Sequence, residues 1–230
     1  MKSDANKTGL TLIEMLIVVA IIVILTTMVI GLAGRVTDQS KEQLTRNTIG
    51  ILTSALRQFH DYEYRYIDNP IYTPPQRQFY LGLDFPLDCS GFDVPTLQMT
   101  LDNSLGLAAG SVVINPAAAH NDPDYSGCEV LYFFLSRVSE CRKTLDKIDE
   151  TLTTSEGANN QPMNIAITYS SGAVKVYPLL RVIDPWGTTL RYKYYDNITL
   201  DPHSKLTFPV IISAGPDKRF GTADDISSRK

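Results

Sequence analysis

A single carboxylate, Glu14, lies near the start of a largely apolar run that extends from Leu10 to Gly34. About 20 apolar residues in a helix span the hydrocarbon layer of a bilayer, so this run is long enough to cross a membrane. An ionised carboxylate in such a helix costs about 2.5–3.5 kcal/mol at the centre and less near the ends. The chemistry that Glu14 offers is therefore charge pairing, and we expect an oppositely charged partner for it.

A secretory signal peptide is the alternative interpretation of this segment. It too would have a basic leader, here with Lys2 and Lys7, and the residues Gly31-Leu32-Ala33 would provide a small-residue cleavage site. Signal peptides, however, have apolar regions of only about 7–15 residues. The longer run and its sharp boundary at Gly9 favour a retained anchor over a soluble protein or enzyme released after Ala33.

The sequence Gly9-Leu10-Thr11-Leu12-Ile13-Glu14, followed by the apolar run, resembles the processing signature of type IV pilins and of type II secretion pseudopilins. The resemblance implies that a prepilin peptidase removes the leader, residues 1–9, by cutting between Gly9 and Leu10 and then methylates Leu10. It also implies that residues 10–34 cross the inner (cytoplasmic) membrane once, with the head outside the cytoplasm. An inner-membrane assembly platform would then join the subunit to copies of itself and related minor pilins in a periplasmic or surface filament.

The same resemblance gives Glu14, the fifth residue of the mature chain, a role in assembly. Cleavage creates an α-amino group whose pKa is about 7.7–8.0, so the new terminus is mostly cationic at neutral pH. In a stack of helices, the amine on Leu10 of one subunit can pair with Glu14 of its neighbour. Because removing one partner of a buried ion pair typically costs about 3–5 kcal/mol, we expect assembly to depend on this pairing.

Three further carboxylates, Asp217, Asp224 and Asp225, lie in the segment Ser213–Ile226 near the C-terminus. Calcium takes six to eight oxygen ligands from carboxylates, backbone carbonyls and water, and a glycine-containing acidic loop can fold around it. An EF-hand is excluded, because Arg219 stands at the third position counted from Asp217. The loop resembles the calcium site of major (G-type) pseudopilins, which implies Asp217 and either Asp224 or Asp225 as ligands. The alternative is a solvated acidic turn.

The sequence Asp184-Pro185-Trp186-Gly187 is typical of a type I turn. Asp is favoured at the first position, Pro presets the backbone at the second, and Gly is favoured at the fourth. Trp186 is the only tryptophan of the chain. We interpret the segment as a structural turn whose aromatic side chain packs on the core, without a catalytic role.

Composition indicates an ordinary globular protein with one membrane segment, because 43% of the 230 residues are hydrophobic, 20% are charged and the net charge is −4. Loss of the leader would remove Lys2, Lys7 and Asp4 and change the net charge from −4 to −5. No run of basic residues is present to follow a phosphate backbone, so nucleic-acid binding is not expected. The histidines are scattered and no catalytic motif occurs, which favours a structural protein over an enzyme.

The three cysteines, Cys89, Cys128 and Cys141, permit one disulfide in an oxidising compartment. Cys128 and Cys141 fall on one predicted helix, about 20 Å apart, which is too far for a bond. A disulfide would therefore join Cys89 to one of them. Three separate buried thiols are an equally open alternative.

Periodicity predicts the elements that position these residues. The N-terminal helix is expected to continue through an amphipathic part, residues 35–62, because apolar or small residues recur at three- and four-residue steps in that part. This stripe consists of Leu44, Thr48, Ile51, Leu52, Ala55, Phe59 and Tyr62. Residues 63–230 would form the head. Repeated prolines predict an irregular insertion over residues 63–125.

A second helix is predicted over residues 126–151, beginning with a capping box between Ser126 and Glu129. Alternating apolar residues from Met163 onward predict a hairpin, followed by further strands and the C-terminal loop within residues 163–226. The predicted fold is α+β and pilin-like, with a long membrane-spanning N-terminal helix packed on an antiparallel sheet.

These features together predict a structural subunit of a pilus-like filament. Head-to-tail contacts that do not close on themselves generate such filaments. The resemblance points most closely to a pseudopilin of a type II secretion system. The alternative hypothesis is a type IV pilin subunit that serves adhesion or motility.

Overall fold

The computed structural model describes residues 12–61, 66–68, 78–80, 84–117, 120, 124–157, 160–195 and 205–229. For residues 28–36, 66–68, 78–80, 124, 195 and 205 it describes the backbone alone. The chain divides into two compact units, Met1–Lys41 and Glu42–Lys230, and helix α1, Leu12–Asp61, contributes to both. The α+β class is confirmed, with an N-terminal helix and antiparallel strands.

The first unit contains the N-terminal part of α1. Its large apolar side chains are exposed from Leu12, which is 85% exposed, to Leu25, which is 56% exposed. The hydroxyl of Thr27 donates to the helix's own carbonyls at Val23 and Ile24, so this polar group is satisfied locally. Within the part of the chain that the structure describes, no helix combines the length and the apolar character that crossing a membrane requires.

The C-terminal part of α1 supplies one wall of the core in the second unit. Leu52, Ala55, Leu56 and Phe59 are completely buried, whereas Leu44 is 37% exposed. The stripe residues Thr48, Leu52, Ala55 and Phe59 therefore pack as their spacing predicts, whereas Ile51 is partly buried and Leu44 is exposed. The described helix reaches Asp61, and Tyr62, the last residue of the predicted stripe, lies outside the described residues.

The prediction of an irregular insertion over residues 63–125 is corrected in the parts of this segment that the structure describes. The segment contains the short strands β1, Tyr66–Asp68, and β2, Gln78–Tyr80, then helix α2, Val94–Ser104, and strand β3, Val112–Asn115. Asp93 caps α2 by accepting a hydrogen bond from the Thr96 amide at 3.0 Å. Pro95 stands in the first turn of α2, where a proline starts a helix rather than breaking it.

The predicted single helix over residues 126–151 is also corrected. Helix α3 spans Asp124–Arg137, and helix α4, Ser139–Leu145, follows after Val138 adopts an extended backbone. A short 3-10 helix, η2, follows at Glu150–Leu152. The Arg142 side chain donates to the Ser136 carbonyl at 3.0 Å, which satisfies a backbone group freed by this break.

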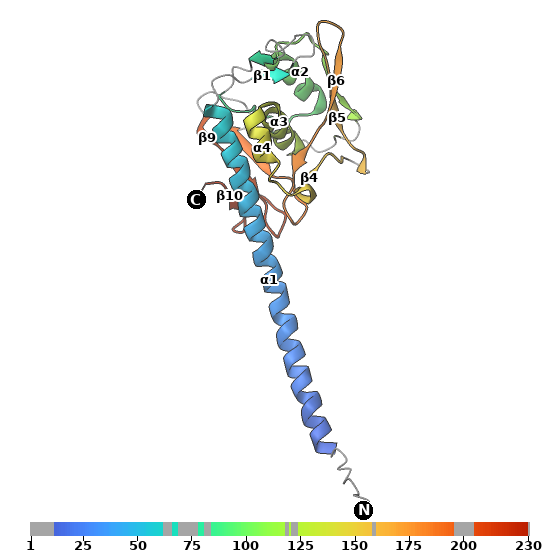
Figure 1. Ribbon diagram of the computed structural model, residues 1–230, viewed down its shortest axis with the longest axis vertical. Helices are drawn as coiled ribbons and strands as arrows, with labels where there is room; N and C mark the ends of the chain where they lie inside the picture. The colour runs from blue at the N-terminus through green and yellow to red at the C-terminus, as the bar shows by residue number, and fades with distance from the viewer. Residues whose placement is uncertain are drawn as a thin grey trace, which may run out of the picture. The chain divides into compact units, whose positions relative to one another are not determined.

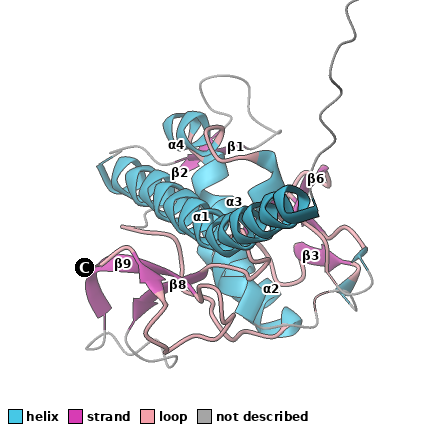
Figure 2. Cartoon of the chain, turned by 90° about the horizontal axis from the view of Figure 1, so that it is seen from below, coloured by secondary structure: helices cyan, strands magenta, loops and turns pink. Residues whose placement is uncertain are grey.

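The two helices have different neighbours. The hydroxyl of Thr144 on α4 donates to the Gln58 side chain at 2.7 Å, so α4 docks on α1 (Figure 1). Helix α3 instead contacts the strands β7, Arg181–Val182, and β8, Arg191–Tyr195. In Figure 2, β8 and β9 lie on one side of α3 and β3 and β6 lie on the other.

The strands form small antiparallel sheets rather than the one sheet that we predicted. The predicted hairpin is present as β5, Asn164–Thr168, and β6, Val174–Pro178, and β3 extends it to three strands in the order β3-β5-β6. A second sheet has the order β10-β9-β8, with β9 at Lys205–Ser213 and β10 at Ile226–Ser227. Strand β4, Thr153–Thr154, pairs with β7. Helix α3, which contacts β7 and β8, lies between the two three-stranded sheets in Figure 2.

All three cysteines are buried and unbonded to one another. Cys128 and Cys141 lie on different helices, so the geometry assumed for one continuous helix does not apply. Burial raises the pKa of both thiols to about 12 and also raises the pKa of Cys89. The alternative of three separate buried thiols is the one found in the structure.

Two leucines on the same helix test whether α1 is part of the folded core. Leu52→Ala should lower the free energy of unfolding of the full-length chain by about 2–5 kcal/mol, because it removes a completely buried side chain. Leu44→Ala is the matched control and should cost about 0.5 kcal/mol or less, because Leu44 is partly exposed. Urea titrations in detergent measure both values. Equal losses would contradict this packing.

Candidate functional site

The two residues of the predicted leader cleavage, Gly9 and Leu10, lie outside the described residues. Glu14 is described and stands in the first turn of α1. Its neighbours on the helix, Ile13 and Met15, are 65% and 55% exposed. The carboxylate is therefore placed within an exposed apolar surface.

The Asp184 turn is built around one buried carboxylate. The Gly187 amide donates to the Asp184 carbonyl at 2.9 Å and closes the turn. The amides of Trp186 and Thr188 both donate to Oδ1 of Asp184, at 3.1 and 2.9 Å. Trp186 is partly buried against the core. Because Asp184 is only 2% exposed, these donors satisfy a carboxylate that water does not reach.

The same carboxylate connects the turn to the C-terminal loop. Oδ2 of Asp184 accepts a hydrogen bond from the Ser213 hydroxyl at 2.7 Å, and this hydroxyl oxygen accepts from the Gly215 amide at 3.1 Å. Gly215 has φ +65°, and a Cβ at this position would collide with the Asp224 carbonyl. Only glycine fits there. The structure therefore joins the Asp184 turn to the C-terminal loop.

The three loop carboxylates accept hydrogen bonds from the loop's own backbone. The Arg219 amide donates to Asp217 at 2.8 Å, the Asp217 amide donates to Asp224 at 3.1 Å, and the Gly221 amide donates to Asp225 at 2.8 Å. Hydrogen bonds from Thr222 and from the Asp217 amide lower the pKa of Asp224. Within the described residues, no three Asp, Glu, His or Cys side chains gather in a way that could hold a metal ion.

One buried side-chain atom of this loop has no hydrogen-bond partner among the described residues. It is Oδ1 of Asp225, which is buried. Oδ2 of the same carboxylate accepts from the Gly221 amide. A buried carboxylate oxygen without a donor is costly, so this oxygen is the one that a bound cation would satisfy.

A buried ionic cluster, which the sequence analysis missed, lies beneath α3. Oε2 of Glu129 lies 2.6 Å from Nε2 of His120, and Oε1 lies 3.8 Å from Nη1 of Arg181. The side chains of His120 and Glu129 are only 1% and 0% exposed. The predicted capping box is wrong, because α3 already begins at Asp124 and Glu129 pairs with His120.

Ser126, the other half of the predicted box, serves the tertiary structure as well. Its hydroxyl donates to the Phe92 carbonyl at 2.8 Å. Burial alone would lower the pKa of His120, but the hydrogen bond and the charge of Glu129 outweigh burial and raise that pKa above its ordinary value. The only sequence signal of this cluster was a histidine, His120, shortly before the helix.

Arg181 links the buried cluster to residues nearer the surface. Its Nε donates to the Thr189 hydroxyl at 3.1 Å and its Nη2 donates to the Glu156 carbonyl at 2.5 Å. The guanidinium lies 3.8 Å from the centre of the Tyr125 ring, within cation–π distance. Arg181 thus fixes α3, β7 and the segment around Glu156 to one another.

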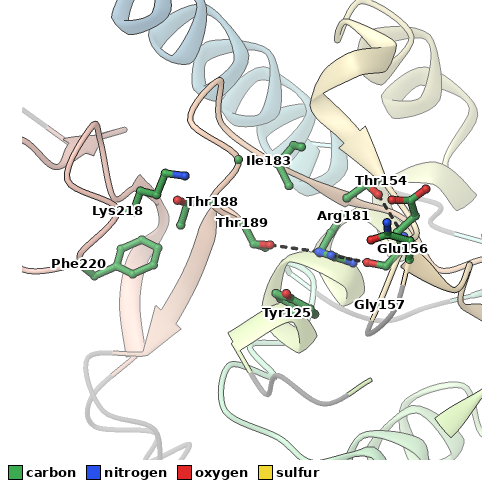
Figure 3. Close-up of a pocket in the computed structure, with 12 residues that line it drawn as sticks. Tyr125, Thr154, Glu156, Gly157, Arg181, Ile183, Thr188, Thr189, Lys218 and Phe220 are labelled. Atoms are coloured by element: carbon green, nitrogen blue, oxygen red, sulfur yellow. Dashed lines mark hydrogen bonds between the residues drawn. The ribbon is translucent and has the colours of Figure 1, made fainter. Parts of the chain in front are cut away.

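A cavity of about 520 Å³ opens beside Arg181 (Figure 3). Its walls come from the start of α3, the segment after β4, the Asp184 turn and the C-terminal loop. Lys218 and Phe220 lie on one side, and Arg181, Glu156 and Thr154 lie on the other. The complete lining is Tyr125, Thr154, Glu156, Gly157, Asn160, Arg181, Ile183, Gly187, Thr188, Thr189, Lys218 and Phe220.

The raised pKa of His120 gives the stability of the head a defined pH dependence. Protonated His120 stabilises the fold fully below its ordinary pKa of about 6.5, and this contribution is lost as the pH rises through the raised pKa. His120→Asn should therefore destabilise the protein more at about pH 5.5 than at about pH 9. Urea titrations at several pH values measure this difference.

Glu129→Gln is the second variant of this test. It removes the carboxylate that raises the pKa, which leaves burial to disfavour the protonated imidazole. Acidification should then destabilise this variant at His120 instead of stabilising it. A pH-independent loss in His120→Asn would contradict the assigned pairing.

Comparison with known proteins identifies the N-terminal segment. Residues 4–30 match the family described as the prokaryotic N-terminal methylation motif. No curated protein and no solved structure matches the chain. The matched residues include Gly9, Leu10 and Glu14. The chain therefore carries the N-terminal methylation motif that forms the leader of type IV pilins and pseudopilins.

Proposed function

We propose that the protein is a structural subunit of a pilus-like filament and, more specifically, a major-type pseudopilin of a type II secretion system. The observation that carries this proposal is the match of residues 4–30 to the N-terminal methylation motif. The exposed apolar surface of α1 from Leu12 to Leu25 supports it, because such a surface needs lipid or neighbouring helices to cover it.

The proposed route begins with a subunit stored in the inner membrane through residues 10–34, with the head outside the cytoplasm. A prepilin peptidase cuts between Gly9 and Leu10 and methylates Leu10. The assembly platform then adds the mature subunit to copies of itself and related minor pilins. Glu14 pairs with the new amine of a neighbouring subunit. This amine supplies the positive charge that a carboxylate within an apolar surface needs.

A type IV pilin subunit for adhesion or motility is the second candidate. The segment between α1 and α3 favours it, because α2, β1, β2 and β3 form ordered structure where a compact head would need only a connection. Genes that neighbour this one would separate the two candidates, since secretion and surface pili use different companion proteins. Both candidates share the leader chemistry.

The N-terminus of the mature protein tests the proposed processing. In cells with an active prepilin peptidase, mass spectrometry should find a chain that begins at Leu10 with a methylated amine. The same chain in cells without the peptidase should retain Gly9. A mature chain that begins at Gly34 would instead show signal-peptide cleavage and would refute the proposal.

Two glutamate variants on α1 separate processing from assembly in the same cells. Glu14→Gln should leave cleavage at Leu10 intact and strongly reduce filament formation, because the amine of the neighbouring subunit loses its carboxylate. Glu42→Gln is the matched control, since Glu42 is exposed and pairs with Arg46 at 2.8 Å on the same helix. Normal filaments in Glu14→Gln would exclude the pairing.

We also propose that the C-terminal loop binds calcium. The buried Oδ1 of Asp225 supports this, because it has no hydrogen-bond donor among the described residues. Both oxygens of Asp224 already accept hydrogen bonds, so Asp225 is the better candidate of the two. Asp217 and carbonyls at the Ser213–Gly215 end of the loop would supply further oxygen ligands.

Calcium should stabilise the folded head. At a free concentration of about 100 times its dissociation constant, it should raise the free energy of unfolding by about 2.7 kcal/mol. Asp225→Asn should remove most of this gain, whereas Asp146→Asn, at an exposed residue that ends α4, should keep it. Thermal unfolding with calcium and with chelator measures the effect. An identical melting temperature in both would exclude the site.

A further inference from the structure

The cavity beside Arg181 concentrates backbone strain. Only two non-glycine residues among the described ones have a left-handed backbone, Asn160 with φ +55° and Lys218 with φ +60°. Both line this cavity. Asparagine tolerates this conformation, but lysine has no local interaction that favours it. Strain of this kind persists where it places a side chain for a purpose.

The lining combines one exposed cation with many hydrogen-bonding groups. Lys218 stands on the side of the C-terminal loop, and the hydroxyls of Thr188 and Thr189 lie between it and Arg181 (Figure 3). Thr154 and Asn160 add further donors and acceptors on the other walls. The Glu156 side chain is exposed and acidic. A ligand that fits this set carries one negative charge and several groups that both donate and accept hydrogen bonds.

The wall that faces Lys218 is held by hydrogen bonds. Arg181 is 6% exposed and is held by Thr189 and by the Glu156 carbonyl. Across the cavity, the Arg191 guanidinium lies 3.9 Å from the centre of the Phe220 ring. The parts of the wall that Arg181 and Phe220 form therefore do not need to be ordered when a ligand binds, which preserves affinity. Phe220 and Tyr125 also offer aromatic surface to a carbon skeleton.

We propose that this cavity binds a small carboxylate that bears several hydroxyl groups, which is the chemistry of the sugar acids. Its volume of about 520 Å³ falls within the range of small-molecule sites, about 300–1,000 Å³. A bare inorganic anion would leave most of that volume unfilled. In this arrangement Lys218 binds the carboxylate, while Thr188, Thr189 and Glu156 bind the hydroxyls. The site lies within one subunit and does not depend on filament assembly.

Calorimetric titration of the full-length chain with D-glucuronate tests the proposal. The protein is kept in a polyoxyethylene detergent, because sugar-based detergents would compete. We expect saturable binding with one site per chain. D-glucose lacks the carboxylate and should bind about tenfold more weakly or worse. Inorganic phosphate should not displace glucuronate at equal concentration.

Substitutions at Lys218 distinguish ligand binding from structure. Lys218→Gly should weaken glucuronate binding about tenfold or more, yet leave the melting temperature equal or higher, because glycine adopts φ +60° without strain. Lys218→Arg keeps the charge and should stay within about threefold of the wild type, as should the control Lys143→Gln on the exposed face of α4.

Three results would overturn the proposal. The first is the absence of saturable binding of glucuronate by the wild-type chain. The second is an affinity for glucose or for phosphate that equals the affinity for glucuronate, since either result would contradict the assigned ligand chemistry. The third is unchanged affinity in Lys218→Gly.

Discussion

The head depends on the pairing of one buried carboxylate. Glu129 is completely buried, and an ionised carboxylate in a protein interior is tolerated only when it is paired and hydrogen-bonded. Its partners come from separate parts of the chain, His120 before α3 and Arg181 on β7. These segments must therefore reach their positions together. Arg181 extends the constraint to Thr189 and Glu156, so the wall of the cavity is fixed by the same charge.

Local patterns predicted the parts of the fold that local chemistry decides. The alternation around Ile165 marks the first strand of the hairpin, because β5 buries Ile165 and Ile167. In β6 the alternating residues Val174 and Val176 are both 60% exposed, so the pattern there predicted the strand and not the buried face. The leader could be predicted because residues Gly9 to Glu14 form a contiguous sequence motif that a processing enzyme would recognise. The Asp184 turn was equally predictable, since Asp184, Pro185 and Gly187 each have a positional preference.

Features decided by tertiary contacts were not predictable in this way. A Ser-x-x-Glu pattern looks the same at a helix start and inside a helix, and only the burial of Glu129 beside His120 shows which applies. Pro95 was interpreted as a breaker, although Asp93 before it makes the pair a helix start. Lys218 and Arg181 both line the cavity, although they are 37 residues apart in the sequence. No hydrophobic periodicity predicts that they lie close together.

The buried cysteines have a practical consequence for filament studies. Every thiol of the chain is enclosed, and burial holds the pKa values of Cys128 and Cys141 at about 12. Thiolate, the form that reacts with maleimides, is therefore suppressed at neutral pH. A cysteine introduced at an exposed position, such as Ser171 in the hairpin turn, would be the one reactive thiol of the molecule. Cross-linking of pairs of such introduced cysteines would measure the distances between neighbouring heads. The native cysteines would not need to be removed first.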